Sequence, residues 1–244
     1  MDLTGKTALI TGGAIRLGKA ISLALAKEGC NLLIHYNRSD TSARSVAKDA
    51  QHMGVKASII QADLSDEEQV IELIPKALEL VDHIDILVNN AGVYFRGKGL
   101  ETEFQLLNTQ FMINLFAPFL LTKAFAKQLP EPLNGKIVNI SDARVFHQQT
   151  DHFAYRLTKA SLNEMTVMFA LELAPRITVN ALAPGIMLPL AGYEHIDLDE
   201  LAKKRVPLGT IGSPEIAAKN VLHILDQDFM TGTIIRLDGG EFIQ

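Results

Sequence analysis

The sequence predicts an α/β protein in which one parallel sheet carries helices on both faces. Three observations lead to this prediction. Short apolar runs alternate with longer segments of helical periodicity along all 244 residues. The apolar runs are nearly continuous, as expected of strands that are buried on both sides. No linker or low-complexity stretch interrupts the alternation, so residues 1–244 are predicted to form a single domain.

The first half of the chain contains four predicted strands. They lie at residues 6–11, 31–36, 55–61 and 84–88. The helix after the first strand has apolar residues on one face and ends at Gly29. A second helix is expected at 43–53. A third begins at Ser65, which with Glu68 has the spacing of a capping box, and continues to Val81.

The second half continues the same alternation. Three further strands are expected at residues 136–140, 177–180 and 231–237. A long helix is predicted over residues 103–128, and Pro118 should bend it. A helix at 152–173 follows, and Ser213 is expected to cap a last one.

The composition excludes several classes of protein. Hydrophobic residues make up 48% and charged residues 21%, which is typical of globular chains and not of disordered ones. The net charge of −5 and the lack of a basic run argue against a nucleic-acid partner. The N-terminus lacks a signal-peptide pattern and no apolar run approaches a membrane span, so we expect a cytoplasmic protein without a membrane partner. Cys30 is the single cysteine, and the scattered histidines indicate no metal site.

Polar and glycine-containing motifs follow the predicted strands in order. Thr11–Gly18 connects the first strand to a helix, where glycine lets the backbone approach a pyrophosphate. Asp63 with Leu64 follows the third strand, Asn89–Gly92 the fourth, and Pro184 with Gly185 the sixth. Tyr155 and Lys159 lie one turn apart on one helix face. Each feature alone is also explained as a cap, a turn or a solvated pair. Their order at one edge of the sheet predicts a cofactor site.

On these motifs the chain resembles the short-chain dehydrogenase/reductase family over essentially its whole length. The resemblance implies a Rossmann fold with strand order 3-2-1-4-5-6-7, an NAD(H) or NADP(H) cofactor and a homo-oligomer, often a tetramer. It implies that Tyr155 is the acid/base, that Lys159 lowers its pKa, and that Asn114 positions a relay water. The implied cofactor-binding residues are Thr11, Gly12, Arg16, Leu17, Gly18, Tyr36, Asn37, Arg38, Ser39, Asp63, Leu64, Asn90, Ala91, Gly92, Tyr155, Lys159, Pro184 and Gly185.

Two residues depart from the common family pattern, and both point to one branch. Arg16 replaces the middle glycine of the fingerprint, and Asp142 stands where most members carry a serine. Together with the run His35–Ser39 and the aromatic Tyr94, these changes resemble pteridine reductases and dihydromonapterin reductases. A register slip of one residue would instead present Ser141. The predicted substrate-binding residues are Arg16, Tyr94, Asp142, Tyr155 and Met187.

The sequence therefore predicts an NADPH-dependent reductase of a pterin-like ring. Tyr36, rather than an acidic residue, ends the second strand, and Arg38 and Ser39 are suited to a 2′-phosphate. Two alternatives remain: a ketone or 3-oxoacyl thioester reductase, and a non-catalytic NADP(H)-binding regulatory protein. A substrate loop is expected at about 186–212, with its apolar part at 186–193 as a candidate lid.

Overall fold

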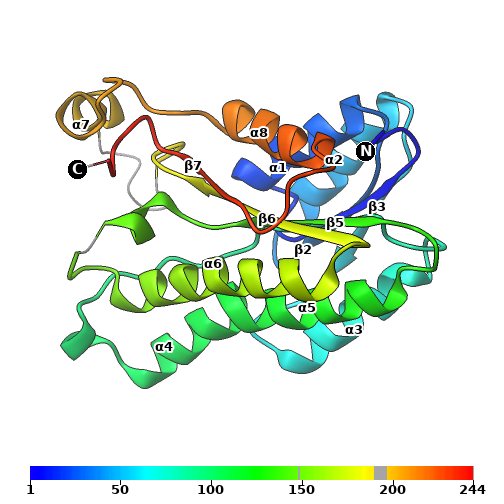
Figure 1. Cartoon of the computed structure of the whole chain (residues 1–244), viewed down its shortest axis with the longest axis horizontal. Coiled ribbons are helices and arrows are strands. Elements are labelled where there is room, and N and C mark those ends of the chain that lie inside the picture. Colours follow the sequence, from blue (N-terminus) through cyan, green and yellow to red (C-terminus); the bar gives the residue numbers. More distant parts are fainter. Residues whose placement is uncertain (148, 190–196, 244) are drawn as a thin grey trace.

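Seven parallel strands form one sheet in the order β3-β2-β1-β4-β5-β6-β7 (Figure 1). The strand bounds are β1 Thr7–Ile10, β2 Asn31–Tyr36, β3 Ala57–Gln61, β4 Ile86–Asn89, β5 Gly135–Ile140, β6 Ile177–Pro184 and β7 Ile234–Leu237. This computed structural model describes residues 1–147, 149–189 and 197–243. The predicted fold class and strand order are confirmed.

Helices cover both faces of the sheet (Figure 1). One face carries α1 Arg16–Lys27, α2 Asp40–His52 and α8 Pro214–Asp226. The other carries α3 Glu67–Leu78, α4 Phe104–Phe111, α5 Ala117–Gln128 and α6 Phe153–Leu173. A short helix, α7 Leu198–Arg205, lies within the predicted substrate loop. Residues 190–196, which include the second half of the candidate lid, lie outside the described residues.

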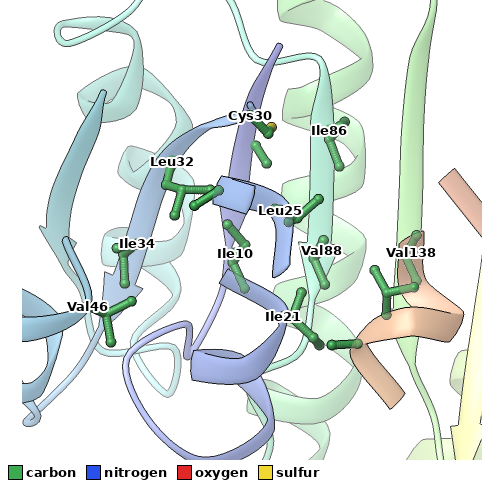
Figure 2. Close-up of a cluster of buried hydrophobic side chains, with 14 of the residues drawn as sticks. Ile10, Ile21, Leu25, Cys30, Leu32, Ile34, Val46, Ile86, Val88 and Val138 are labelled. Carbon is green, nitrogen blue, oxygen red and sulfur yellow. The ribbon is translucent and has the colours of Figure 1, made fainter. Parts of the chain in front are cut away.

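Two apolar clusters fix the helices to the sheet, because successive strand residues point to opposite faces. Figure 2 shows part of the cluster beneath α1 and α2, with Ile10 of β1 near Leu25 of α1 and Ile34 of β2 beside Val46 of α2. The neighbouring strand residues Leu9, Leu33, Leu87 and Ile137 belong to the cluster on the other face. Cys30 is buried in the first cluster, as a small apolar side chain would be.

The predicted bend in the long helix coincides with a π-helical turn, Met112–Phe116, which separates α4 from α5. Pro118 follows two residues later and lacks the N–H that would bond to the carbonyl of Asn114 in a continuous α-helix. The discontinuity lies at the π-helical turn, which carries Asn114.

The predicted capping box at the start of α3 is wrong. The N-cap is Asp66, whose Oδ1 accepts hydrogen bonds from the backbone N–H groups of Glu68 at 3.0 Å and Gln69 at 3.3 Å. Ser65 instead donates its hydroxyl to Asp63 at 2.7 Å. Helix α3 therefore starts one residue later than the spacing of serine and glutamate indicated.

One helical run is apolar and long enough to cross a membrane. The segment Phe104–Gln128 has a mean hydropathy of 1.2 over its most apolar window, of which 28% is buried. The expectation that no segment reaches this length and composition is thus wrong for this run. A single such run is weak evidence for a membrane span, because helices of water-soluble proteins meet the same criterion.

Candidate active site

A cavity of about 750 Å³ lies at the carboxyl ends of the strands, the edge where ligands bind in open α/β sheets. It brings together most of the predicted site residues. Among the residues that line it are Gly12, Arg16, Leu17, Gly18, Tyr36, Asn37, Arg38, Ser39, Asp63, Leu64, Asn90, Ala91, Gly92, Tyr94, Asp142, Tyr155, Lys159, Pro184, Gly185 and Met187. Thr11 and Asn114 do not line the cavity, but each of them contacts a residue that does.

The glycine turn between β1 and α1 leaves room for a close backbone approach. A Cβ on Gly18 would lie 2.1 Å from the carbonyl oxygen of Gly12, so only glycine fits there. The Asn90 side chain donates to the Thr11 carbonyl at 2.8 Å and to the Gly12 carbonyl at 3.2 Å. Thr11 Oγ1 accepts from the Asn90 and Ala91 amides at 2.9 and 3.0 Å. The turn is therefore held from β4.

His35 has a role that its sequence pattern did not predict. Its Nδ1 accepts from the Gly12 N–H at 3.0 Å, and its Nε2 donates to the Ala62 carbonyl at 3.1 Å. Burial lowers the pKa of His35 to about 4, so the ring stays neutral and keeps Nδ1 as an acceptor. His35 therefore fixes the glycine turn from β2.

Arg16 occupies a backbone conformation that favours glycine. Its φ of 53° lies in the left-handed region, where a residue with a side chain is strained by about 1–2 kcal/mol. The guanidinium is exposed and donates to the carbonyl of Pro189. Strain at a ligand cavity points to a functional side chain, because glycine would relieve it.

The end of β2 lacks a free carboxylate. The Tyr36 hydroxyl donates to Asp40 at 2.8 Å, and Arg44 pairs with the same carboxylate at 2.8 Å. Arg38 is exposed at the cavity. Hydrogen bonds from Ser65 lower the pKa of Asp63, and the charge of Arg38 lowers it further. An exposed cation at the cavity suits a phosphate here.

These features fit a dinucleotide cofactor. A Cβ at Gly18 would fill the space inside the glycine turn between β1 and α1, so that space exists only because the residue is glycine. The Ser141 hydroxyl lines the cavity, is buried and has no hydrogen-bond partner among the residues that the structure describes. An unsatisfied buried hydroxyl is costly unless a bound group pairs with it.

The catalytic candidates meet around one hydrogen bond. The Tyr155 hydroxyl donates to Asp142 Oδ2 at 2.8 Å, so Asp142 and not Ser141 faces the tyrosine. The other Asp142 oxygen accepts from the Arg144 backbone N–H at 2.8 Å, which fixes the carboxylate. Lys159 Nζ donates to the Ile140 carbonyl at 2.7 Å. Ser141 and Asp142 both line the cavity, so which of them faces the substrate stays a prediction.

The pKa of Tyr155 moves in the opposite direction from the one expected. Burial raises it well above 10, and Asp142 raises it further by charge and hydrogen bond. Burial also raises the pKa of Asp142 and lowers that of Lys159 to about 8. Without a cofactor, Lys159 therefore does not lower the pKa of Tyr155 below its ordinary value. The site holds the tyrosine protonated, ready to donate.

Asn114 connects the loop after β4 to α6. Its Oδ1 accepts from the Val93 N–H at 2.8 Å, and its Nδ2 donates to the Val93 carbonyl at 2.9 Å and to Thr158 at 3.2 Å. Both amide hydrogens are thus used within the protein. The expected role in holding a relay water stays a prediction and depends on the free lone pair of Oδ1.

Tyr94 forms an aromatic wall beside the reacting group. Its ring centroid lies 4.7 Å from that of Tyr155, edge to face, and 4.6 Å from that of His152. Its hydroxyl is buried without a partner among the described residues. Met187 lines the same cavity and packs against Gly212, where a Cβ would clash with its sulfur. The contact of His152 with Tyr94 carries no signal in the sequence.

A protein-family model described as short chain dehydrogenase matches residues 6–192. The chain belongs to this family. A curated relative, the 3-oxoacyl-[acyl-carrier-protein] reductase FabG of Aquifex aeolicus, is 36% identical over 249 residues, or 99% of each chain. The L-rhamnose 1-dehydrogenase (NADP(+)) of Thermoplasma acidophilum is 34% identical and covers 100% of this chain and 98% of its own length.

A solved structure of another short-chain dehydrogenase is similar to the whole chain. It is FolM alternative dihydrofolate reductase 1 from Brucella canis, complexed with NADP, with a TM-score of 0.92 and 34% identity. The match covers 100% of this chain and 97% of the other. These relatives differ in substrate, so the choice among substrates depends on the site itself.

Proposed function

We propose that this short-chain dehydrogenase is an NADPH-dependent reductase of a pterin-like ring, such as a dihydropterin or dihydrofolate. The hydrogen bond from Tyr155 to Asp142 carries the proposal. A carboxylate beside the proton donor opposes the negative charge that develops on a carbonyl oxygen during ketone reduction. Reduction of a ring C=N bond places the proton on nitrogen and forms no oxyanion. Asp142 is therefore compatible with an imine-type bond.

NADPH supplies a hydride when it is bound. The glycine turn at Gly12 and Gly18 is suited to its pyrophosphate, and Arg38 with Ser39 to its 2′-phosphate. The Brucella protein, which shares 34% of its sequence with this chain, forms a complex with NADP. These observations support NADP(H) as the cofactor.

The residues around the ring have separate roles in this proposal. Tyr155 donates the proton to the ring nitrogen, and the Asp142 carboxylate accepts from that hydroxyl and orients it. The tyrosinate that remains regains its proton from solvent. Lys159 supplies an ammonium donor beside the tyrosine and the cofactor ribose. Tyr94 stacks on a flat ring, which contributes about 0.5–1.5 kcal/mol beyond the area it buries.

A second candidate function is the reduction of a ketone or 3-oxoacyl thioester. It is favoured by the 36% identity to the Aquifex reductase. A purely regulatory NADP(H)-binding protein is less well supported, because Tyr155, Lys159 and Asp142 together form a site for proton transfer. For the enzyme, we propose a homo-oligomer in the cytoplasm.

The first prediction tests the substrate class with Asp142→Ser. The kcat/KM for NADPH oxidation is measured with a dihydropterin, with dihydrofolate and with a 3-oxoacyl thioester. In the wild type we expect kcat/KM to be highest for the dihydropterin or for dihydrofolate. In the variant it should lose about tenfold or more, because the carboxylate that holds Tyr155 is gone. Thioester reduction should hold or rise, because a hydroxyl stabilises an oxyanion.

Tyr155→Phe serves as the control, since it removes the transferable proton and should retain cofactor binding. Robust turnover of the thioester by the wild type, with none of any pterin or folate, would overturn the proposed substrate class. The second candidate function would then stand.

A further inference from the structure

A second cavity of about 540 Å³ lies between the loop after β5 and the end of α7. The residues that line it are Arg144, Gln149, Thr150, Asp151 and Arg205. It is lined by two arginines in a chain whose overall charge is −5. None of these side chains has a role in the proton transfer proposed above.

The two arginines at this cavity differ in their partners. Arg205 lies 2.5 Å from Glu241. Arg144 forms no ion pair among the residues that the structure describes, although the charges of Asp142 and Glu241 act on it from farther away and raise its pKa. Its guanidinium carbon lies 6.0 Å from the centre of the Tyr94 ring. A half-buried guanidinium that no carboxylate contacts directly can take an anion as a direct ligand.

Arg144 also lies between this cavity and the candidate active site. Its backbone N–H is held by Asp142, and its side chain lies against Tyr94. Tyr155, the proposed proton donor, also contacts the Tyr94 ring, with 4.7 Å between the two ring centroids. The Tyr94 ring is therefore a neighbour of both Tyr155 and Arg144. A ring that stacks on Tyr94 would direct a long substituent toward Arg144.

We propose that Arg144 binds a negatively charged substituent of the substrate, a carboxylate or a phosphate. The guanidinium offers two parallel N–H donors to either group. Gln149 and Thr150 supply further polar groups in the same cavity. This inference rests on the proposed function only where it places the substrate ring against Tyr94.

The test compares substrates that share one reducible ring and differ in charge. They are dihydrofolate, with carboxylates, a dihydropterin phosphate and the uncharged dihydrobiopterin. The quantity measured is the ratio of kcat/KM for each ionised substrate to that for the uncharged one. In Arg144→Gln this ratio should fall about tenfold or more, through KM, as expected for a lost hydrogen bond to a charged group. The substrate whose ratio falls identifies the anion.

Two further variants distinguish charge from fold. Arg144→Lys keeps the cation and should recover part of the ratio. Lys76→Gln removes the same charge from α3, where Lys76 pairs with Glu72, and should leave the ratio unchanged. An unchanged ratio in Arg144→Gln with both ionised substrates would overturn the inference and leave the proposed function intact.

A binding measurement separates the two proposals. Calorimetry follows p-aminobenzoylglutamate and inorganic phosphate titrated into the NADP-loaded protein. If the wild type reduces no pterin but binds one of these anions, and Arg144→Gln does not, the anion site stands and the proposed function fails. If neither anion binds and no ionised substrate is preferred, the anion site is wrong.

Discussion

Lys159 is the buried cation nearest to the chemistry, and its titration gives a prediction at the scale of one residue. Burial lowers the pKa of Lys159 to about 8, and the negative charge of Asp142 offsets part of that shift by raising it. As the pH rises through about 8, Lys159 loses the proton that makes it an ammonium donor. With NADPH below saturation, kcat/KM should therefore decline with an apparent pKa near 8.

Tyr155 and His152 do not titrate in this window. The pKa of Tyr155 lies well above 10, and that of His152 is lowered from 6.5. Deprotonation of Lys159 does not destabilise the fold in this window. The unfolded chain keeps the Lys159 proton up to about pH 10.5, so the free energy of unfolding rises with pH between about 8 and 10.5. Lys159→Arg, which stays protonated, should abolish the decline, and a flat wild-type profile between about pH 7 and 9.5 would contradict the assignment.

Arg38 carries the prediction for the cofactor. It is an exposed cation at the end of β2, where Tyr36 and Arg44 already occupy the carboxylate of Asp40. Arg38→Asp should reverse the preference of the enzyme, because it replaces a donor for the 2′-phosphate with a group that repels it. The ratio of kcat/KM for NADPH to that for NADH should fall about a hundredfold.

Lys48→Asp makes the same charge change on the exposed side of α2 and should leave that ratio nearly unchanged. A wild-type enzyme that uses NADH as well as NADPH would reject the assignment before any variant is made.

The sequence identified the site residues whose function follows from their residue type and their position in a motif. Tyr155, Asp142 and the glycine turn follow from the motifs. The direction of the pKa of Tyr155 did not follow, because it depends on how much water the folded site excludes. Arg144 was also missed, since its position between the second cavity and Tyr94 is a property of the assembled loops and not of the local sequence.

At the scale of secondary-structure elements, the N-terminus of α3 shows where spacing rules fail. Asp66 accepts two backbone hydrogen bonds, and Gln69 donates to its second oxygen at 2.8 Å. Ser65 is engaged with Asp63 instead. Two adjacent residues that both suit an N-cap cannot be separated by the sequence alone, because the choice depends on where the chain leaves β3.

Asp66→Ala should therefore lower the free energy of unfolding by about 1 kcal/mol, the usual loss for an N-cap. Ser65→Ala should lower it by less than about half of that, since it removes no cap. Urea unfolding at one fixed protein concentration measures both. A larger loss of unfolding free energy for Ser65→Ala than for Asp66→Ala would show that Ser65 is the N-cap.

The strands were located more reliably than their ends. Their apolar runs identified all seven, because both faces of the sheet are covered. The end of β6 was placed too early, at residue 180, although the strand continues to Pro184 beside Leu237 of β7. The pairing partner supplies that extension, and it lies far away in the sequence. The same holds for the π-helical turn, which packs against α6.

At the scale of the whole molecule, an exposed apolar face on α5 and α6 lacks a partner. Phe116 and Phe119 at the start of α5 are 43% and 39% exposed, and Met168 and Leu171 on α6 are 62% and 79% exposed. The rings of Phe119 and Phe169 lie 5.8 Å apart, so the two helices present one surface. Such a face on a water-soluble protein is typical of an interface between subunits.

The same face explains the apolar run Phe104–Gln128 without a membrane. A helix whose outer side is covered by another copy of the chain needs apolar residues all round, as a membrane span does. The two explanations differ in what covers the helix. A subunit interface leaves the assembled protein in water, whereas a span requires detergent or lipid for extraction.

The predicted state is a homotetramer with this face buried between copies. Light scattering coupled to gel filtration should give a mass about four times 26.7 kDa for the wild type. Met168→Glu together with Phe119→Glu should lower the mass to that of a dimer or monomer, because carboxylates at the centre of an apolar contact lose their hydration. Met53→Glu places the same charge on an exposed apolar residue after α2 and should leave the mass unchanged. A wild-type protein of about 26.7 kDa in solution would contradict the assembly, and recovery only in detergent would favour the membrane explanation.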